Sequence, residues 1–208
     1  MEIARAAAGL FMRDGLRATR AEDIARAAGV APRTFYRYFG SKEESLGPLF
    51  AAGAQKWVEA VRDAPAQLPV PEALHHAVVS TLTPGVGVRP ESLEWVRSLL
   101  RLAEGNPALL RVWGEACQTA ERMLAGALAA RSAGDTGDTG GAGESADGWP
   151  VVGASLELRL SAAVAGAAVR VAVEAWAAGE DAADGPDGPV ALAVRNLGAL
   201  RDFPWGAG

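Results

Sequence analysis

Apolar residues recur every three or four positions along most of the chain, a spacing typical of amphipathic helices. A first helix is expected over 2–14, where Ile3, Ala7 and Leu10 form one stripe before Gly15. Further helices are expected over residues 41–62, 72–82, 90–105, 107–131, 155–178 and 190–203. The pattern therefore predicts an all-α protein.

Two short helices joined by a tight turn are expected between residues 19 and 39. Thr19 followed by Glu22 fits a capping box, in which each side chain bonds the backbone amide of the other residue. Gly29 suits a left-handed turn, and Pro32 suits the first position of a helix, where its missing amide costs nothing.

The helix expected over 32–39 has two unlike faces. At about 100° per residue, Phe35 and Phe39 share the side that packs on the preceding helix. The opposite, polar side consists of Arg33, Thr34 and Arg37, flanked by Tyr36 and Tyr38. Such a face suits the major groove of DNA, where arginine bonds guanine edges and tyrosine hydroxyls reach phosphates. A solvated polar face without a partner is the alternative for this stretch alone.

The segments EDIARAAGV, RTFYRYF and SKEESL lie within residues 18–46. Together they resemble the helix-turn-helix of the TetR family of bacterial transcriptional repressors. The resemblance implies a three-helix DNA-binding head followed by a larger helical body for ligand binding and dimerisation. We expect DNA contacts from Thr19, Arg20, Arg33, Thr34, Tyr36, Arg37, Tyr38 and Lys42.

Three positions depart from the family pattern. Arg20 stands where a second threonine is common, and Ser45 where an apolar residue is frequent. Ala31 replaces a hydroxyl residue that often caps the DNA-reading helix, a loss of about 1 kcal/mol. Lys42 is expected at the DNA backbone, in a helix that a second capping box, Ser41 with Glu44, would begin.

We expect a helix-turn-helix domain at 1–46, a connecting helix at 47–64 and an effector-binding and dimerisation domain at 65–208. Pro48 falls inside the long helix expected from residue 41, where a proline kinks the axis and provides either a hinge or a tolerated irregularity. Residues 132–150 are rich in glycine, serine and aspartate, which predicts a flexible loop.

Aromatic and sulfur-containing side chains in the body are candidates for an effector cavity. The candidate set is His75, Trp95, Leu99, Trp113, Cys117 and Trp176. Plain core packing is the alternative for such residues. His75 and His76 would point about 100° apart on a helix, so no metal site is expected, and no cofactor is. The resemblance implies that the helices at 155–178 and 190–203 pair with a second copy, since family members dimerise through helices in this position.

Charge is unevenly distributed along a chain whose net charge is −5. Residues 1–62 carry ten Lys and Arg against seven Asp and Glu, a net +3; the remainder carries ten against eighteen, a net −8. The positive field thus coincides with the expected DNA-reading helix. One cysteine fits a reducing cytoplasm, and charges within the apolar stretches argue against a membrane span or a signal peptide.

Together with these observations, the resemblance implies a homodimeric, cytoplasmic repressor that a small apolar or aromatic effector releases from a palindromic operator in double-stranded DNA. Repression itself is implied by the resemblance alone. A DNA-binding regulator that answers to a protein partner, with no small-molecule ligand, is the alternative. An enzyme is not expected, because the chain has no nucleophile elbow, metal-ligand cluster or phosphate-binding glycine loop.

Overall fold

The computed structural model describes residues 1–136 and 154–205, which form nine α-helices and one short 3-10 helix, η1. The all-α prediction is confirmed. In chain order the elements are α1 (Glu2–Asp14), α2 (Ala21–Ala27), α3 (Pro32–Tyr38), η1 (Glu44–Leu46), α4 (Gly47–Asp63), α5 (Val70–Leu82), α6 (Pro90–Glu104), α7 (Pro107–Thr136), α8 (Leu156–Ala178) and α9 (Pro189–Ala199).

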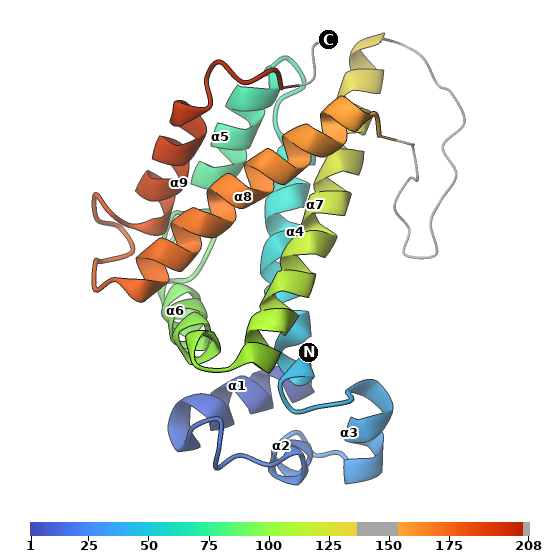
Figure 1. Ribbon diagram of the computed structural model, residues 1–208, viewed down its shortest axis with the longest axis vertical. Coiled ribbons are helices and arrows are strands. Elements are labelled where there is room, and N and C mark those ends of the chain that lie inside the picture. Colours follow the sequence, from blue (N-terminus) through green and yellow to red (C-terminus); the bar gives the residue numbers. More distant parts are fainter. Residues whose placement is uncertain (137–153, 206–208) are drawn as a thin grey trace.

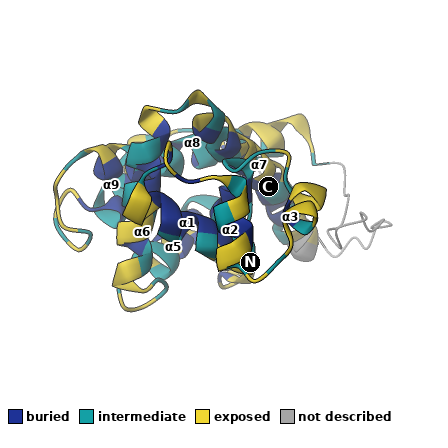
Figure 2. Cartoon of the chain, turned by 90° about the horizontal axis from the view of Figure 1, so that it is seen from below, coloured by how far each residue is buried: buried dark blue, intermediate teal, exposed yellow. Residues whose placement is uncertain are grey.

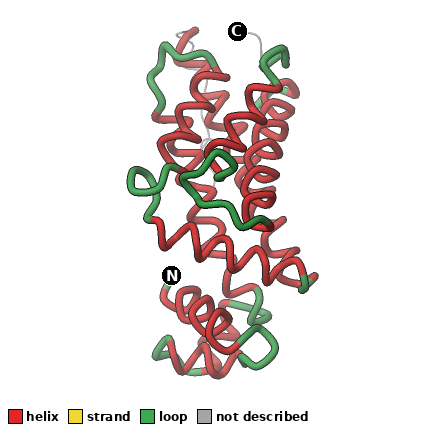
Figure 3. Tube along the Cα trace, turned by 90° about the vertical axis from the view of Figure 1, so that its left-hand side faces the viewer, coloured by secondary structure: helices red, strands yellow, loops and turns green. Residues whose placement is uncertain are grey.

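The molecule consists of a small helical head beneath a taller helical body (Figures 1 and 3). Helices α1 to α3 form the head, whose core contains the fully buried Phe35 and Ile24. Helix α4 rises from the head beside α7, and α8 crosses α7 in the body. The body core is built around Val58, Leu74 and Leu124, from α4, α5 and α7. A continuous packed path therefore joins the two parts.

The short helices of the head begin and end where the sequence predicts, with one shift. Gly15 and Gly29 adopt positive φ values of 83° and 68°, which lets the chain turn sharply after α1 and α2. The N-cap of α2 is Arg20, not Thr19: the Arg20 amide donates to Asp23 Oδ2 at 3.1 Å. The expected box of Thr19 with Glu22 is thus wrong by one residue.

The segment after α3 also differs from the expected long helix beginning at Ser41. Ser41 Oγ accepts the Glu44 amide at 3.2 Å, but this contact opens only the 3-10 turn η1. Helix α4 begins afresh at Gly47, so Pro48 lies in its first turn. The predicted proline kink is therefore wrong, because a first-turn proline interrupts no intrahelical bond.

The far end of α4 is held by one arginine of α7. Arg131 Nη1 donates to the Ala64 carbonyl at 2.7 Å, and its Nη2 donates to the Leu68 carbonyl at 2.9 Å. A guanidinium carries five donors in a fixed fork, so it can satisfy several carbonyls that a loop leaves unpaired. The proline-rich connection between α4 and α5 is thereby fixed to α7.

Two body helices differ in length from the expectation. Helix α7 continues past Arg131 to Thr136, so residues 132–136 of the expected loop are helical; residues 137–150 lie outside the described residues. Helix α9 ends at Ala199 instead of continuing to Phe203, and the chain then turns so that Trp205 packs against the body core. Within the described ranges, no helix combines the length and apolarity that crossing a bilayer requires.

Candidate nucleic-acid interface

Helix α3 presents its polar side chains outward because its aromatic anchor faces inward. Phe35 is fully buried and packs in the head core with Ile24 and Ala25 of α2. Arg33 and Arg37 are exposed, Thr34 is partly exposed, and Tyr36 is 52% exposed. Seen from below the head, the ribbon of α3 is mostly exposed (Figure 2).

The exposed residues of α3 are partly organised by one another. Arg37 Nη2 donates to Tyr38 Oη at 3.3 Å, and its guanidinium carbon lies 4.9 Å from the centre of the Tyr38 ring. Arg33 and Arg37 have no carboxylate among the ion pairs of the described residues, so both cations face solvent. Two unneutralised guanidiniums on one exposed helix form a surface suited to an anionic partner.

Helix α2 contributes a carboxylate at the edge of this surface. Tyr36 Oη donates to Glu22 Oε1 at 3.0 Å. This hydrogen bond is the main reason why the pKa of Tyr36 is raised above its ordinary value. The phenol is therefore neutral at physiological pH, and its proton already has an acceptor within the protein.

Thr19 does not share the exposed face. Its side chain is buried, and its hydroxyl donates to the Gly15 carbonyl at 2.9 Å. The structure thus gives Thr19 a part in holding the α1–α2 connection. Arg20, the next residue, is exposed and is the N-cap of α2.

Lys42, which follows α3 in the chain, bonds the connection between α1 and α2. Its Nζ donates to the Thr19 carbonyl at 2.9 Å and also to the Leu16 carbonyl. An ammonium group has three donors, so one remains for an external acceptor. Lys42 therefore has a structural role in the head in addition to any contact with a phosphate.

The candidate cavity residues of the body are brought together only in part. Leu99 and Trp176 are buried, at 2% and 1% exposure, and Trp113 packs against the apolar clusters of both. Trp113 Nε1 donates to Glu174 Oε1 at 2.7 Å. Trp95 instead is 38% exposed at the surface of α6. The set thus divides between core and surface, and the structure does not assemble it around one hollow.

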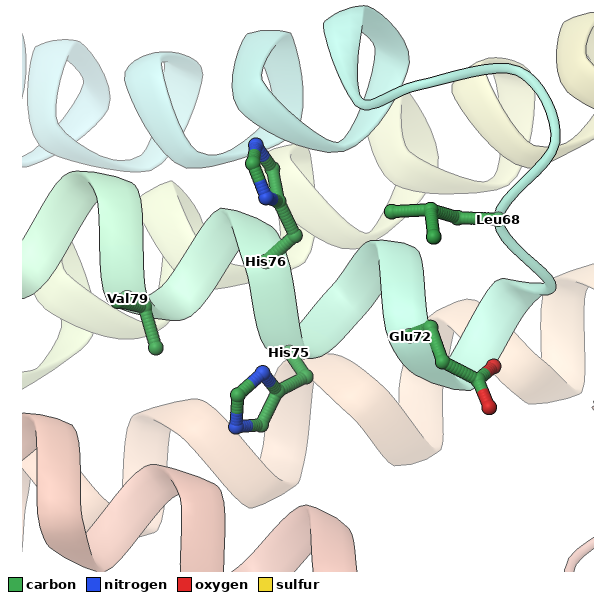
Figure 4. Close-up of a pocket in the computed structure, with 5 residues that line it drawn as sticks. All are labelled: Leu68, Glu72, His75, His76 and Val79. Carbon is green, nitrogen blue, oxygen red and sulfur yellow. The ribbon is translucent and has the colours of Figure 1, made fainter.

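His75 lies apart from that set, at a surface hollow of about 370 Å³. The hollow is lined by Leu68, Glu72, His75, His76 and Val79. The two histidines point to opposite sides of α5 (Figure 4). Among the residues that the structure describes, no cluster of three or more His, Cys, Asp or Glu side chains is arranged to hold a metal ion.

Cys117 lies on α7, four residues after Trp113, and is half-buried. Burial raises the pKa of its thiol to about 12. The group is therefore neutral at physiological pH and is a poor nucleophile, since the thiolate is the reactive form.

Comparisons with known proteins show which family the sequence of this head matches. Residues 3–46 match the family described as "Bacterial regulatory proteins, tetR family". The matched range covers α1, α2, α3 and η1, which include the exposed arginines. The head of this chain therefore belongs to the TetR family.

One curated relative aligns with the chain over a longer stretch than the head. The chain is 34% identical over 140 residues to the HTH-type transcriptional regulator TcmR of Streptomyces glaucescens. That alignment covers 64% of this chain and 60% of TcmR, so the match spans less than two thirds of the relative's length.

Solved TetR-family structures share the fold over nearly the whole chain. A Thermus thermophilus FadR, a TetR-family repressor solved with lauroyl-CoA, superimposes with a TM-score of 0.55 at 23% identity, over 96% of this chain and 91% of FadR. Salmonella enterica GusR gives a TM-score of 0.55 at 17% identity, over 98% and 93%. At these identities the likeness establishes the fold.

The sequence does not reveal the partners that the fold gives to Glu22, Lys42 and Glu44. Glu22, expected in a capping box with Thr19, instead accepts the Tyr36 hydroxyl. Lys42, expected at the DNA backbone, also binds backbone carbonyls within the head. Glu44 accepts the Gly40 amide and faces Arg111 of the body. The expected capping box has Glu44 accept the Ser41 amide, but the amide that Glu44 accepts is that of Gly40. No local pattern indicated Arg111, which lies 67 positions along the chain from Glu44.

Proposed function

We propose that this TetR-family protein is a DNA-binding transcriptional regulator that reads its operator with α3. The observation that carries the proposal is the division of α3 into a buried Phe35 and the exposed Arg33 and Arg37. A helix with this division can lie in the major groove while its aromatic anchor holds it on the head. The net positive charge of residues 1–62 favours approach to DNA.

In this proposal the residues of the head have different roles. Arg33, Thr34 and Arg37 contact base edges, and Tyr36 and Tyr38 contact the walls of the groove. Arg20 and Lys42 contact phosphates, with Lys42 using the donor that the two carbonyls leave over. Thr19 acts through the α1–α2 connection, because its hydroxyl is buried and bonded within the head.

The proposed active form is a homodimer that binds a palindromic operator. Each head would occupy one major groove, with half-sites about one helical turn or more apart. The supporting feature is an apolar stripe on α8, where Leu156, Leu160 and Val171 are 74%, 52% and 48% exposed. We place α8 and α9 in the two-fold interface, since a helical stripe of this kind is stabilised when it is covered.

We further propose that the protein represses transcription and that a small apolar or aromatic effector releases it from DNA. The effector would enter the body where α6, α7 and α8 meet, near Trp113 and Trp176. The likeness to a repressor solved with lauroyl-CoA supports a body that admits a small molecule. Binding would favour a head spacing that no longer fits both grooves.

Operator selection from genomic fragments, followed by binding to arginine variants, tests the proposal. Arg33→Ala and Arg37→Ala should each weaken operator binding by about 1–3 kcal/mol and relax preference at one base position. Arg201→Ala is the matched control, because Arg201 is an exposed arginine at the far end of the body. If both α3 variants keep the full sequence preference, α3 is not the reading helix.

A further inference from the structure

One carboxylate connects the end of the proposed reading helix to the body. The Gly40 amide, two residues after α3, donates to Glu44 Oε2 at 2.9 Å. The other oxygen of the same carboxylate, Oε1, lies 3.6 Å from Arg111 Nη2 of α7. Glu44 therefore contacts a head segment and a body helix at once.

The tight turn around η1 fixes the direction of the Glu44 side chain. Ser41 Oγ accepts the Glu44 amide, and the next two residues, Ser45 and Leu46, are fully buried. A Cβ atom added at Gly40 would lie 3.2 Å from Glu44 Oε2, so the carboxylate sits directly against the backbone there. The contact is closely packed and leaves the carboxylate little space to move on that side.

Arg111 is shared between the head and its own helix. Its Nε lies 3.8 Å from Glu115 Oε1 one turn along α7, and its Nη2 faces Glu44. Because α7 packs along both α4 and α8, a displacement of α7 moves the guanidinium relative to the head. The ion pair between Arg111 and Glu44 thus couples the position of α7 to the segment that follows α3.

We propose that Glu44 is a positioning residue for the DNA-reading helix. Its ion pair with Arg111 makes this positioning depend on where the body helix α7 lies. With the pair formed, the carboxylate is held against the Gly40 amide and the C-terminal end of α3 is fixed. When α7 moves away, the carboxylate is free to turn to solvent and the end of α3 loosens. The inference rests on the proposed function, since it assigns regulation to the same helix.

Substitutions at the two positions separate the head contact from the body link. Glu44→Gln keeps an oxygen that can accept the Gly40 amide but removes the charge that attracts Arg111. Glu44→Ala removes both contacts. Arg111→Gln breaks the link without touching the head. Arg122→Gln is the matched control, because Arg122 is an exposed arginine of α7 with a Thr119 contact.

Hydrogen exchange of the Gly40 amide in the full chain is the first readout, because it needs no DNA. Arg111→Gln should speed this exchange by about two- to five-fold, the range expected for losing a partly exposed ion pair. Glu44→Ala should speed it further, and Arg122→Gln should leave it unchanged. Equal Gly40 exchange in Arg111→Gln and the unaltered protein would overturn the body link.

Operator affinity of the same variants is the second readout. Arg111→Gln and Glu44→Gln should each weaken binding by about two- to five-fold, and the double variant should be no weaker than either one, since both remove the same pair. Fully additive losses would overturn the coupling. If the unaltered protein binds no operator, the proposed function fails, whereas the Gly40 exchange result still decides the link.

Discussion

The Tyr36 hydroxyl has two competing acceptors once DNA is considered. In the free protein it donates to Glu22 at 3.0 Å, and both side chains are exposed. A phosphate at the same edge of α3 would compete for the proton and would also be repelled by the Glu22 carboxylate. Glu22 therefore limits DNA affinity while holding the Tyr36 phenol in one orientation.

Replacing Glu22 by Gln should lower the pKa of Tyr36 toward its ordinary value of 10.0, because the charged acceptor that raises it is removed. The chain has two tyrosines, so ultraviolet titration of the phenols, with Tyr38→Phe to assign them, measures the change directly. DNA affinity at low salt should rise by about two- to five-fold for all sequences, since one repulsive charge is lost.

The same substitution has a signed effect on stability. A raised pKa in the folded state stabilises the protein below the ordinary pKa, and that contribution disappears as the pH rises through the raised value. Stability of the unaltered protein should therefore fall more steeply above pH 10 than that of Glu22→Gln. Identical phenol titrations in the two proteins would show that the hydrogen bond is absent in solution.

At the scale of single elements, caps and prolines decide where the helices begin and end. Pro48 is the clearest case, because its effect depends entirely on its position in α4. The structure puts it in the first turn, after the separate turn η1. There its ring fits the helical φ angle, and it also restricts the unfolded chain.

Pro48→Ala should accordingly lower the free energy of unfolding by about 0.4–1 kcal/mol, through the greater freedom of the unfolded chain. An interior proline would behave in the opposite way, and its removal would stabilise the helix by about 3 kcal/mol. Urea unfolding of the full chain followed by circular dichroism distinguishes the two. Stabilisation by the substitution would restore the kinked helix expected from the sequence.

The same elements indicate how far the sequence predicts this fold. The C-terminal end of α1 follows from Gly15, and the beginning of α3 follows from Pro32, because both residues act locally. The outward face of α3 follows from the spacing of Phe35 and Phe39. The η1 turn does not follow, because Ser41 and Glu44 fit a longer helix equally well until the Gly40 contact is known.

Side-chain partners distant in the chain explain the remaining differences. Lys42 binds a carbonyl 23 residues away, and Arg111 faces a carboxylate 67 residues away. Helical periodicity identifies which side of a helix is apolar but not which neighbour it meets. Trp95 and Trp176 therefore looked alike in sequence, although one is exposed on α6 and the other is buried on α8.

At the scale of the whole molecule, the described surface includes an apolar stripe on α8 that a single chain leaves uncovered. The apolar stripe of α8 includes Leu160, which is 52% exposed, and α9 packs beside it. In a two-fold interface the same residue is buried in both copies, so its contribution counts twice. The proposed dimer thus depends strongly on this position.

Leu160→Asp should convert the dimer to a monomer. Burying one leucine contributes about 1.5–3 kcal/mol, and two copies per interface raise the dissociation constant by at least about 100-fold. Leu110→Asp is the matched control, since Leu110 is 51% exposed on α7, away from the stripe of α8. Sedimentation velocity measures the change, and operator affinity should fall only for Leu160→Asp, because two linked heads bind a palindrome more tightly than one. A dimer that survives Leu160→Asp but not Leu110→Asp would move the interface from α8 to α7.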